Sequence, residues 1–122
     1  MLNLSKSPKA KNYWLNLNNF RNWHYQISNK LKVKFKNEIK DKICHLKFEK
    51  KIALEFIIYY KFNRKADRSN VCSIVEKFFC DALSEFGVIP DDNDKHILYT
   101  IYKTGGVDKI NPRCDINIIE IE

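Results

Sequence analysis

The sequence contains little glycine or proline, with three of each among its 122 residues. Gly105 and Gly106 form the only glycine pair, so the chain lacks the composition of a disordered or low-complexity protein. Apolar and aromatic residues are plentiful, and a chain of this length can bury roughly two thirds of its unfolded surface. We therefore expect a single folded domain over residues 1–122, with residues 1–10 as a flexible leader.

Long apolar runs are also missing: none approaches the roughly 20 residues that cross a bilayer. The N-terminus lacks an apolar block followed by a small-residue cleavage site. These absences predict a cytoplasmic protein without a membrane segment. The four cysteines lie far apart, without a C-x-x-C pair or a histidine at metal-ligand spacing, which argues against a zinc site. We expect them to be reduced and mostly buried.

Positive charge is concentrated in the first half of the chain. Residues 1–66 contain sixteen Lys or Arg against four acids (+12), and residues 67–122 contain six against eleven (−5), which sum to the net +7. Basic side chains bind polyanions because they displace condensed counterions. The acidic second half suits a polyanion only if its carboxylates hold a cation, as in a metal-dependent nuclease. The alternative is a lysine-rich surface that merely reflects general composition.

Apolar periodicity predicts two helices. Between Ser28 and Leu46 apolar residues recur every four positions, as in an amphipathic helix, although its first turn also alternates as a strand would. From Asn70 to Phe86 a second apolar face recurs, and Gly87 is placed to end this helix. The apolar positions are Leu31, Phe35, Ile39 and Ile43 in the first helix, and Val71, Val75, Phe78, Phe79, Ala82 and Phe86 in the second.

Alternation of apolar residues predicts the strands, and polar or glycine-containing segments predict the loops. The predicted strands are a short one at Tyr13–Leu17, then Ile52–Phe62, Ile97–Lys103 and Cys114–Ile121. The predicted loops are Asn18–Tyr25, Asn63–Ser69, the turn Pro90–Asn93 and the segment with Gly105, Gly106 and Pro112. This order predicts a layered α+β domain with a mixed sheet and two main helices.

The second helix carries a polar stripe. Asn70, Ser73, Lys77 and Asp81 fall within about 80° of one another on a helical wheel, opposite the apolar face. These polar residues also have a purely structural explanation. Lys77 and Asp81 can form an exposed ion pair, Ser69 or Asn70 can be the N-cap, and a lone Asp-Asp pair can be only a turn.

The order of these pieces resembles the RusA family of Holliday-junction resolvases. The family pattern runs D-x-D-N, then K-x-x-x-D-A-L, then a glycine, a few apolar residues and D-D. Here the matching segments are Asp67-Arg68-Ser69-Asn70, Lys77 to Leu83, Gly87 and Asp91-Asp92, preceded by Asn18-Asn19 and followed by Lys103 and the closing strand Ile116 to Ile121. The resemblance is clearest from Asp67 to Asp92.

The resemblance implies a Mg²⁺-dependent DNA endonuclease, with Mn²⁺ as the other suitable ion, that resolves four-way junctions in recombination and repair. It also implies a homodimer. The residues implied in catalysis are Asp67, Lys77 and Asp92, and those implied in metal binding are Asp67, Asp91 and Asp92. Ser69, Asn70 and Asp81 would orient these groups. DNA would be bound by Asn18, Asn19, Arg21 and Lys103, with the Lys-rich first helix along the DNA backbone and Trp23 and Tyr25 able to stack on an exposed base.

Two departures from the family pattern bear on function. Four extra residues separate Asn70 from Lys77, which is about one helical turn and leaves Lys77 near its original face. Ser69 stands where the pattern has its second aspartate, and a hydroxyl is a weaker ligand for a hard cation than a carboxylate. A second hypothesis is therefore a protein of the same fold that binds junctions and cuts them weakly or not at all. A third is a basic protein-interaction domain.

Overall fold

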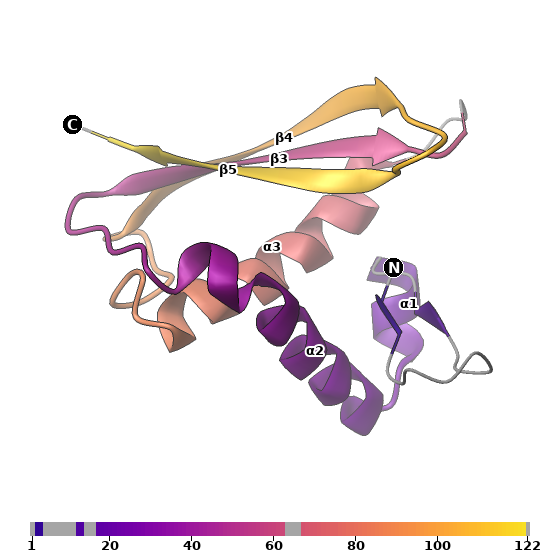
Figure 1. Ribbon diagram of the computed structural model, residues 1–122, viewed down its shortest axis with the longest axis horizontal. Coiled ribbons are helices and arrows are strands. Elements are labelled where there is room, and N and C mark those ends of the chain that lie inside the picture. The colour runs from indigo at the N-terminus through magenta and orange to yellow at the C-terminus, as the bar shows by residue number, and fades with distance from the viewer. Residues whose placement is uncertain (1, 4–11, 14–16, 63–66, 122) are drawn as a thin grey trace.

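The computed structural model describes residues 2–3, 12–13, 17–62 and 67–121 of the chain (Figure 1). The elements are β1 (Leu2–Asn3), β2 (Asn12–Tyr13), α1 (Leu17–Asn22), α2 (Tyr25–Ile43), β3 (Ile52–Tyr60), α3 (Arg68–Glu85), β4 (Ile97–Val107) and β5 (Arg113–Glu120). The predicted α+β fold with a mixed sheet is confirmed. Among the described residues, no helix is both long and apolar enough to cross a membrane.

The main sheet has three strands in the order β4-β3-β5. β4 runs parallel to β3, and β5 runs antiparallel to it. A parallel pair needs a long crossover between its strands, and α3 supplies that crossover from β3 to β4. As Figure 1 shows, α2 and α3 lie together on one face of the sheet, so the fold has two layers.

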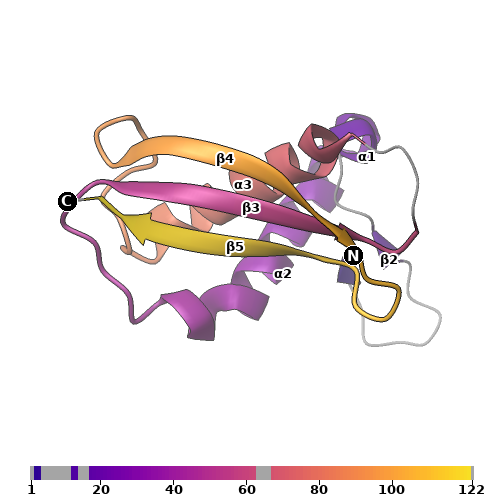
Figure 2. The same cartoon turned by 90° about the horizontal axis from the view of Figure 1, so that it is seen from above.

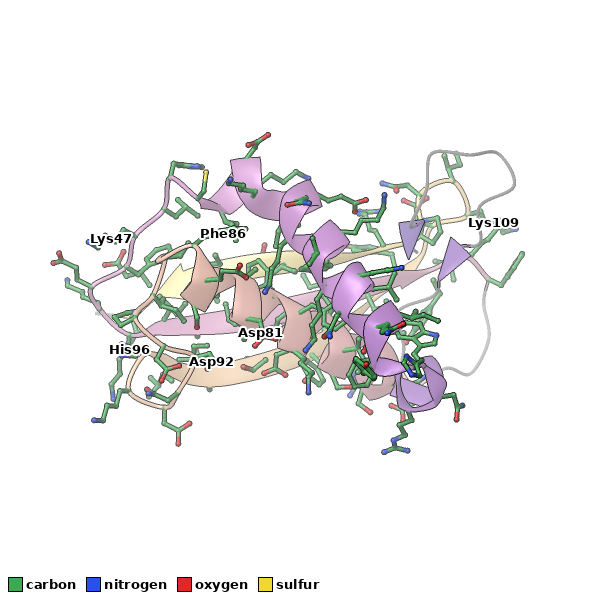
Figure 3. The ribbon with its side chains drawn as sticks, turned by 90° about the horizontal axis from the view of Figure 1, so that it is seen from below. Lys47, Asp81, Phe86, Asp92, His96 and Lys109 are labelled. Carbon is green, nitrogen blue, oxygen red and sulfur yellow. The ribbon has the colours of Figure 1, made fainter. Side chains whose placement is uncertain are left out.

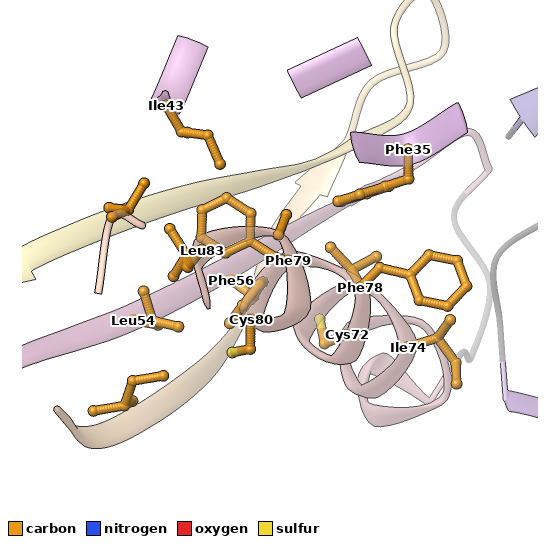
Figure 4. Packing of buried hydrophobic residues seen from close by; sticks show 14 of the residues in the cluster. Phe35, Ile43, Leu54, Phe56, Cys72, Ile74, Phe78, Phe79, Cys80 and Leu83 are labelled. Carbon is orange, nitrogen blue, oxygen red and sulfur yellow. The ribbon is translucent and has the colours of Figure 1, made fainter. Parts of the chain in front are cut away.

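The hydrophobic core lies between α3 and β3. Phe56 on β3 packs edge-on against Phe79 on α3, with ring centroids 6.2 Å apart, and Phe78 packs against Phe35 of α2 at 5.7 Å (Figure 4). Every second residue of β3 from Ile52 to Ile58 is buried on this side. Edge-to-face aromatic pairs contribute about 0.5–1.5 kcal/mol each beyond the area that they bury.

The two main helices confirm the periodicity of the sequence. Predicted apolar positions on α2 and α3 are buried or half-buried. α2 is displaced by about one turn from its predicted bounds, because His24 acts as its N-cap and accepts the Gln26 amide on Nδ1 at 3.3 Å. α3 ends as predicted: Gly87 has φ of 72°, and the Val88 amide donates to the Leu83 carbonyl at 2.9 Å, which forms a Schellman motif.

Two predicted loops were wrong. The first half of Asn18–Tyr25 is the helix α1, because Phe20 packs edge-on against Phe78 of the core at 6.2 Å and tertiary packing outweighs the local amide content. The segment with Gly105 and Gly106 continues β4 to Val107. A register shift occurs there, and a Cβ at Gly105 would lie 2.5 Å from the Tyr59 ring, so only glycine lets the strand pass.

The N-terminal predictions are tested only in part. Within the predicted leader 1–10, residues 2–3 pair with 12–13 as a short antiparallel ladder, and residues 4–11 lie outside the described ones. Of the predicted strand over 13–17, Tyr13 lies in β2 and Leu17 begins α1. Residues 63–66 of the predicted loop also lie outside the description, while Asp67 caps α3.

Candidate functional site: an acidic cleft beside α3

A polar cleft of about 390 Å³ opens between α3, the turn that follows it and the first half of β4. Its α3 wall is formed by positions three or four residues apart, which share one face of a helix. The lining residues are Ser73, Glu76, Lys77 and Cys80 from α3, Asp92 and Asp94 from the turn, and Ile97–Thr100 from β4. Lys77 and Asp92, which belong to separate sequence motifs, therefore line the same cleft.

Negative charge is crowded around the thiol of Cys80. Burial, followed by the charges of Glu76, Asp92 and Asp81, raises the Cys80 pKa to about 12. Burial also raises the pKa of Asp92, with a smaller contribution from its hydrogen bond and charge interaction with Asp91 and from the charge of Asp81. Figure 3 shows Asp92 on the turn beside the α3 segment that carries Asp81. The nearby charges of Asp91 and Asp81 thus disfavour the ionised form of Asp92, a cost that a positive charge in the cleft would offset.

Glu76 is held in the cleft wall by β4. The Tyr102 hydroxyl donates a short hydrogen bond to Glu76 Oε2, and the pair is partly buried. Burial and the neighbouring Glu76 carboxylate raise the pKa of Tyr102, so the phenol stays protonated and remains the donor. One carboxylate oxygen is used by Tyr102, which fixes the orientation of the group while leaving the other oxygen for a ligand.

Lys77 lies at the rim of the cleft, where α1 meets α3. Its side chain is exposed, and its ammonium lies 5.3 Å from the centroid of the Phe20 ring, a cation–π distance. The predicted polar stripe divides at this point. Ser73 and Lys77 line the cleft, whereas Asp81 lies 3.8 Å from Lys32 Nζ of α2 in an ion pair.

Asp67 and Ser69 lie at the other end of α3. Asp67 is the N-cap: its Oδ1 accepts the Ser69 amide at 3.0 Å and the Ser69 hydroxyl at 2.6 Å. The Ser69 hydroxyl, and then its amide, lower the pKa of Asp67. The Asn70 amide donates to the Asp67 carbonyl at 3.1 Å. All three residues of the predicted motif are therefore used in starting the helix.

The structure does not bring Asp67 and Asp92 together within one chain. Asp92 lies near Cys80, and the thirteen residues from Asp67 to Cys80 rise roughly 20 Å along a helix. Asp91 is directed into the turn, where its Oδ1 accepts the Asp92 amide at 2.8 Å and its Oδ2 accepts the Asn93 side-chain amide at 3.2 Å. The predicted ligand set of Asp67, Asp91 and Asp92 therefore does not converge on one point in a single copy.

The residues predicted to bind DNA are spread over several elements. Arg21 is exposed in the last turn of α1, and Asn18 and Asn19 lie in the same helix, although their side chains are outside the description. Lys103 Nζ lies 2.8 Å from Glu55 Oε2, on the face of the sheet that points away from the helices. Lys103 is thus separated by the whole sheet from the cleft.

A basic surface runs along α2. This helix contains six lysines against Glu38 and Asp41, a difference of four positive charges. The lysines are Lys30, Lys32, Lys34, Lys36, Lys40 and Lys42. Tyr25 at the start of α2 is 65% exposed and packs against the His24 ring at 4.5 Å, so an aromatic platform adjoins this positive charge.

Sequence reasoning missed Glu76, Asp94 and Tyr102. On the helical wheel Glu76 falls about 100° from the polar stripe, so it was not assigned to the site. Its contact with Tyr102 depends on the β4 register, which pairs Tyr102 with the core residue Phe56 and so turns Tyr102 toward α3. The alternation of β4 could have shown the direction of Tyr102, but not the partner that it meets.

Variants of Asp67 distinguish a helix cap from a metal ligand. Asn caps helices about as well as Asp, so at pH 7 Asp67→Asn should lower the thermal midpoint only slightly, through the lost charge, while Asp67→Ala should lower it by several degrees. Because the folded-state pKa of Asp67 is lowered, its ionised carboxylate stabilises the fold at pH values above the unfolded-state pKa of about 3.9. This stabilisation is lost as pH falls through the folded-state pKa. The difference from Asp67→Ala should therefore shrink in acid. Equal midpoints at pH 7 would contradict the cap.

Asp92 should have the opposite effect on stability. Its pKa is raised in the folded state, so its ionised form costs stability at neutral pH, and that cost is absent below the unfolded pKa. We expect Asp92→Asn to raise the thermal midpoint by up to about 2 °C at pH 7 and to have no effect near pH 3. Glu120→Gln, at the exposed end of β5, is the matched control. A lower midpoint for Asp92→Asn at pH 7 would show that no charge crowding exists.

Comparisons with protein-family models and with curated proteins found no match to this chain. The likeness to the RusA family therefore rests on the segment from Asp67 to Asp92 and on the order of the elements. What the cleft does must be inferred from its own residues.

Proposed function

We propose that this protein is a Mg²⁺-dependent endonuclease that cuts branched DNA, such as four-way junctions, by phosphodiester hydrolysis in the cytoplasm during recombination and repair. The observation that carries the proposal is that Lys77 and Asp92 line one acidic cleft together with Glu76. These residues would supply ligands for a cation and a positive charge in one cleft, and both assist hydrolysis of a phosphodiester.

The donors of the cleft fit a hard divalent cation. Mg²⁺ prefers oxygen ligands and is commonly held by one or two carboxylates together with water and substrate phosphate. Asp92 and Glu76 would hold it, and its charge would offset the charges of Asp91 and Asp81 that raise the Asp92 pKa. Mn²⁺ accepts the same ligands. When bound, the ion would polarise the phosphate and lower the pKa of a coordinated water.

The protein side chains would perform the remaining tasks. Tyr102 orients Glu76 through its hydrogen bond, and Lys77 would neutralise charge that develops on the phosphate. This assignment replaces Asp67 with Glu76 as the second carboxylate. Asp67 would act on the site only through the stability of α3, which carries the cleft wall.

The DNA backbone would follow the basic surface of α2. Lys32 and Lys36 pair with Asp81 and Glu85 of α3, so two of the four excess positive charges remain to supply sequence-independent affinity, and Arg21 extends the surface to α1. Tyr25, which is largely exposed, would stack on a base where the strands separate at a junction. Lys103 is left out of this surface because its ammonium is paired with Glu55 on the opposite face of the sheet.

Cleavage of a labelled four-way junction tests the proposal. With Mg²⁺ present, wild type should nick the junction, and Asp92→Asn or Lys77→Met should lower the rate by at least about 100-fold while keeping binding within a few-fold. Tyr102→Phe should lower it by about 10-fold because Glu76 loses its orienting partner. Glu120→Gln, a carboxylate outside the cleft, should cut normally. Unchanged cutting by Asp92→Asn would remove the cleft from the reaction.

Ser69 favours a second candidate function, namely junction binding without efficient cutting. A hydroxyl replaces a carboxylate of the family pattern, and here it donates to Asp67. If the protein is only a binder, wild type should hold junctions with an affinity that falls steeply with salt, without cutting them. This candidate places the metal at Asp67 and not in the cleft, so Ser69→Asp, which adds a second carboxylate there, should then introduce cleavage, measured on the same labelled junction. An active wild type that changes less than about threefold on Ser69→Asp would exclude this candidate.

A further inference from the structure

Two cysteines from distant elements meet at the edge of the hydrophobic core. Cys72 lies in the second turn of α3 and has no exposed surface, whereas Cys114, near the start of β5, is half-buried. Their thiols share a hydrogen bond, and neither forms a disulfide. We call these two residues the thiol pair. Of the other cysteines, Cys44 is exposed at the end of α2 and Cys80 lines the acidic cleft.

The sheet register explains why Cys114 faces α3. Cys114 is paired with Ile58 of β3, and directly paired residues project their side chains from the same face of a sheet. Ile58 is 6% exposed and alternates with the core residues of β3, so this is the face that the helices cover. Figure 2 shows β5 at one edge of the sheet, beside β3, with the helices behind the strands. Cys114 packs there against the buried cluster that contains Cys72 (Figure 4).

The hydrogen bond makes the two thiols chemically unequal. The Cys114 thiol lowers the pKa of Cys72 against the effect of burial, and the charge of Arg68, one helical turn away, acts in the same direction as Cys114. Cys72 in turn raises the pKa of Cys114, and burial adds to this rise. Because the thiolate is the nucleophilic form of cysteine, Cys72 is the stronger nucleophile of the pair. Cys114 is the member that a small molecule from solvent reaches first.

We propose that the thiol pair is a reversible oxidation site, at which a small hydroperoxide such as hydrogen peroxide joins Cys72 and Cys114 in a disulfide. The Cys114 sulfur attacks one peroxide oxygen, the O–O bond breaks, and the other oxygen leaves as water with the thiol proton, which produces a sulfenic acid. The Cys72 sulfur then attacks the sulfenic sulfur, the S–O bond breaks, and a second water carries away the Cys72 proton. The two thiols lose two electrons, and the peroxide accepts them.

The geometry favours this disulfide over the alternatives. A buried cysteine alone is inert, but here a second thiol already lies within hydrogen-bond reach, so closure of the two sulfur atoms to about 2.05 Å would complete the bond. Cys80 lies eight residues beyond Cys72 on the same helix, or about 12 Å, which is too far for a disulfide. The fold therefore selects Cys114 as the partner of Cys72.

The disulfide would fix an edge strand to the core. β5 has β3 as its strand partner in the described sheet, and the new bond would join it to α3 as well. The bond would close a loop of roughly 40 residues, and a loop of this length restricts the unfolded chain strongly. We therefore expect oxidation to stabilise the fold. The inference goes beyond the proposed nuclease and does not depend on it, because it concerns the protein without DNA or metal.

Peptide mapping of the full chain tests the inference. Trypsin cleaves after Lys and Arg, so it releases each cysteine in a separate peptide, namely 43–47, 69–77, 78–95 and 114–122. The protein is treated with about 1 mM hydrogen peroxide, its free thiols are alkylated, and it is digested without reduction. Mass spectrometry should then find peptides 69–77 and 114–122 joined, with two hydrogens fewer than their sum. Dithiothreitol should separate them, because thiol exchange reverses the disulfide.

Thermal unfolding gives a second readout. Oxidation should raise the midpoint of wild type by about 5–15 °C, and dithiothreitol should reverse the rise. Cys114→Ser should show no rise, whereas Cys44→Ser, the matched control that removes an exposed thiol, should respond as wild type does. An oxidised midpoint equal to the reduced one, despite the joined peptides, would overturn the stabilisation.

The wild-type peptide map decides the inference even if Cys114→Ser folds poorly. Recovery of peptides 69–77 and 114–122 as separate alkylated or over-oxidised species would overturn the oxidation site. A predominant link through Cys44 or Cys80 would overturn it as well, because the fold would then not select the thiol pair.

Discussion

The packing of α3 against β3 is the contact on which the rest of the structure depends. Phe56 and Phe79 join the two elements, and Phe78 connects them to α1 and α2. α3 is also the crossover between the two parallel strands, so its position decides where β4 runs. The cleft has α3 as one wall and β4 as another. A loss of this packing would therefore displace the cleft residues relative to one another before it changed any of them chemically.

Periodicity predicted the elements that carry the core, because burial of one face selects a repeat that the sequence must keep. This is why α2, β3, α3 and the start of β4 were found. α1 was missed because six residues are too few for a helical repeat, and its formation depends on the contact of Phe20 with a distant helix. The length of β4 was missed because glycine usually indicates a turn. At Gly105 it instead leaves space for Tyr59, a neighbour that no local pattern identifies.

The candidate site was predictable only where its residues lie on α3 or in the turn directly after it. Lys77 and Ser73 follow from the polar face of α3, and Asp92 follows from the turn after it. Glu76 could not be assigned, because its place in the cleft depends on Tyr102 from a strand that comes later in the chain. Asp67, predicted to act together with Asp92, lies at the other end of α3 for a related reason. A motif gives the order of residues along the chain, whereas a helix between them sets their separation.

The length of α3 then decides which carboxylates can act together. The four extra residues before Lys77 add about one turn, or roughly 6 Å, between Asp67 and the cleft. Removing that turn would still leave Asp67 more than about 10 Å from Asp92, so the insertion alone does not explain their separation. Glu76 directly precedes Lys77 and keeps its position relative to the cleft whatever the length of the first turn. With Glu76 at this position, the cleft needs no carboxylate from the N-terminus of α3, where Asp67 already accepts a hydrogen bond from the Ser69 hydroxyl.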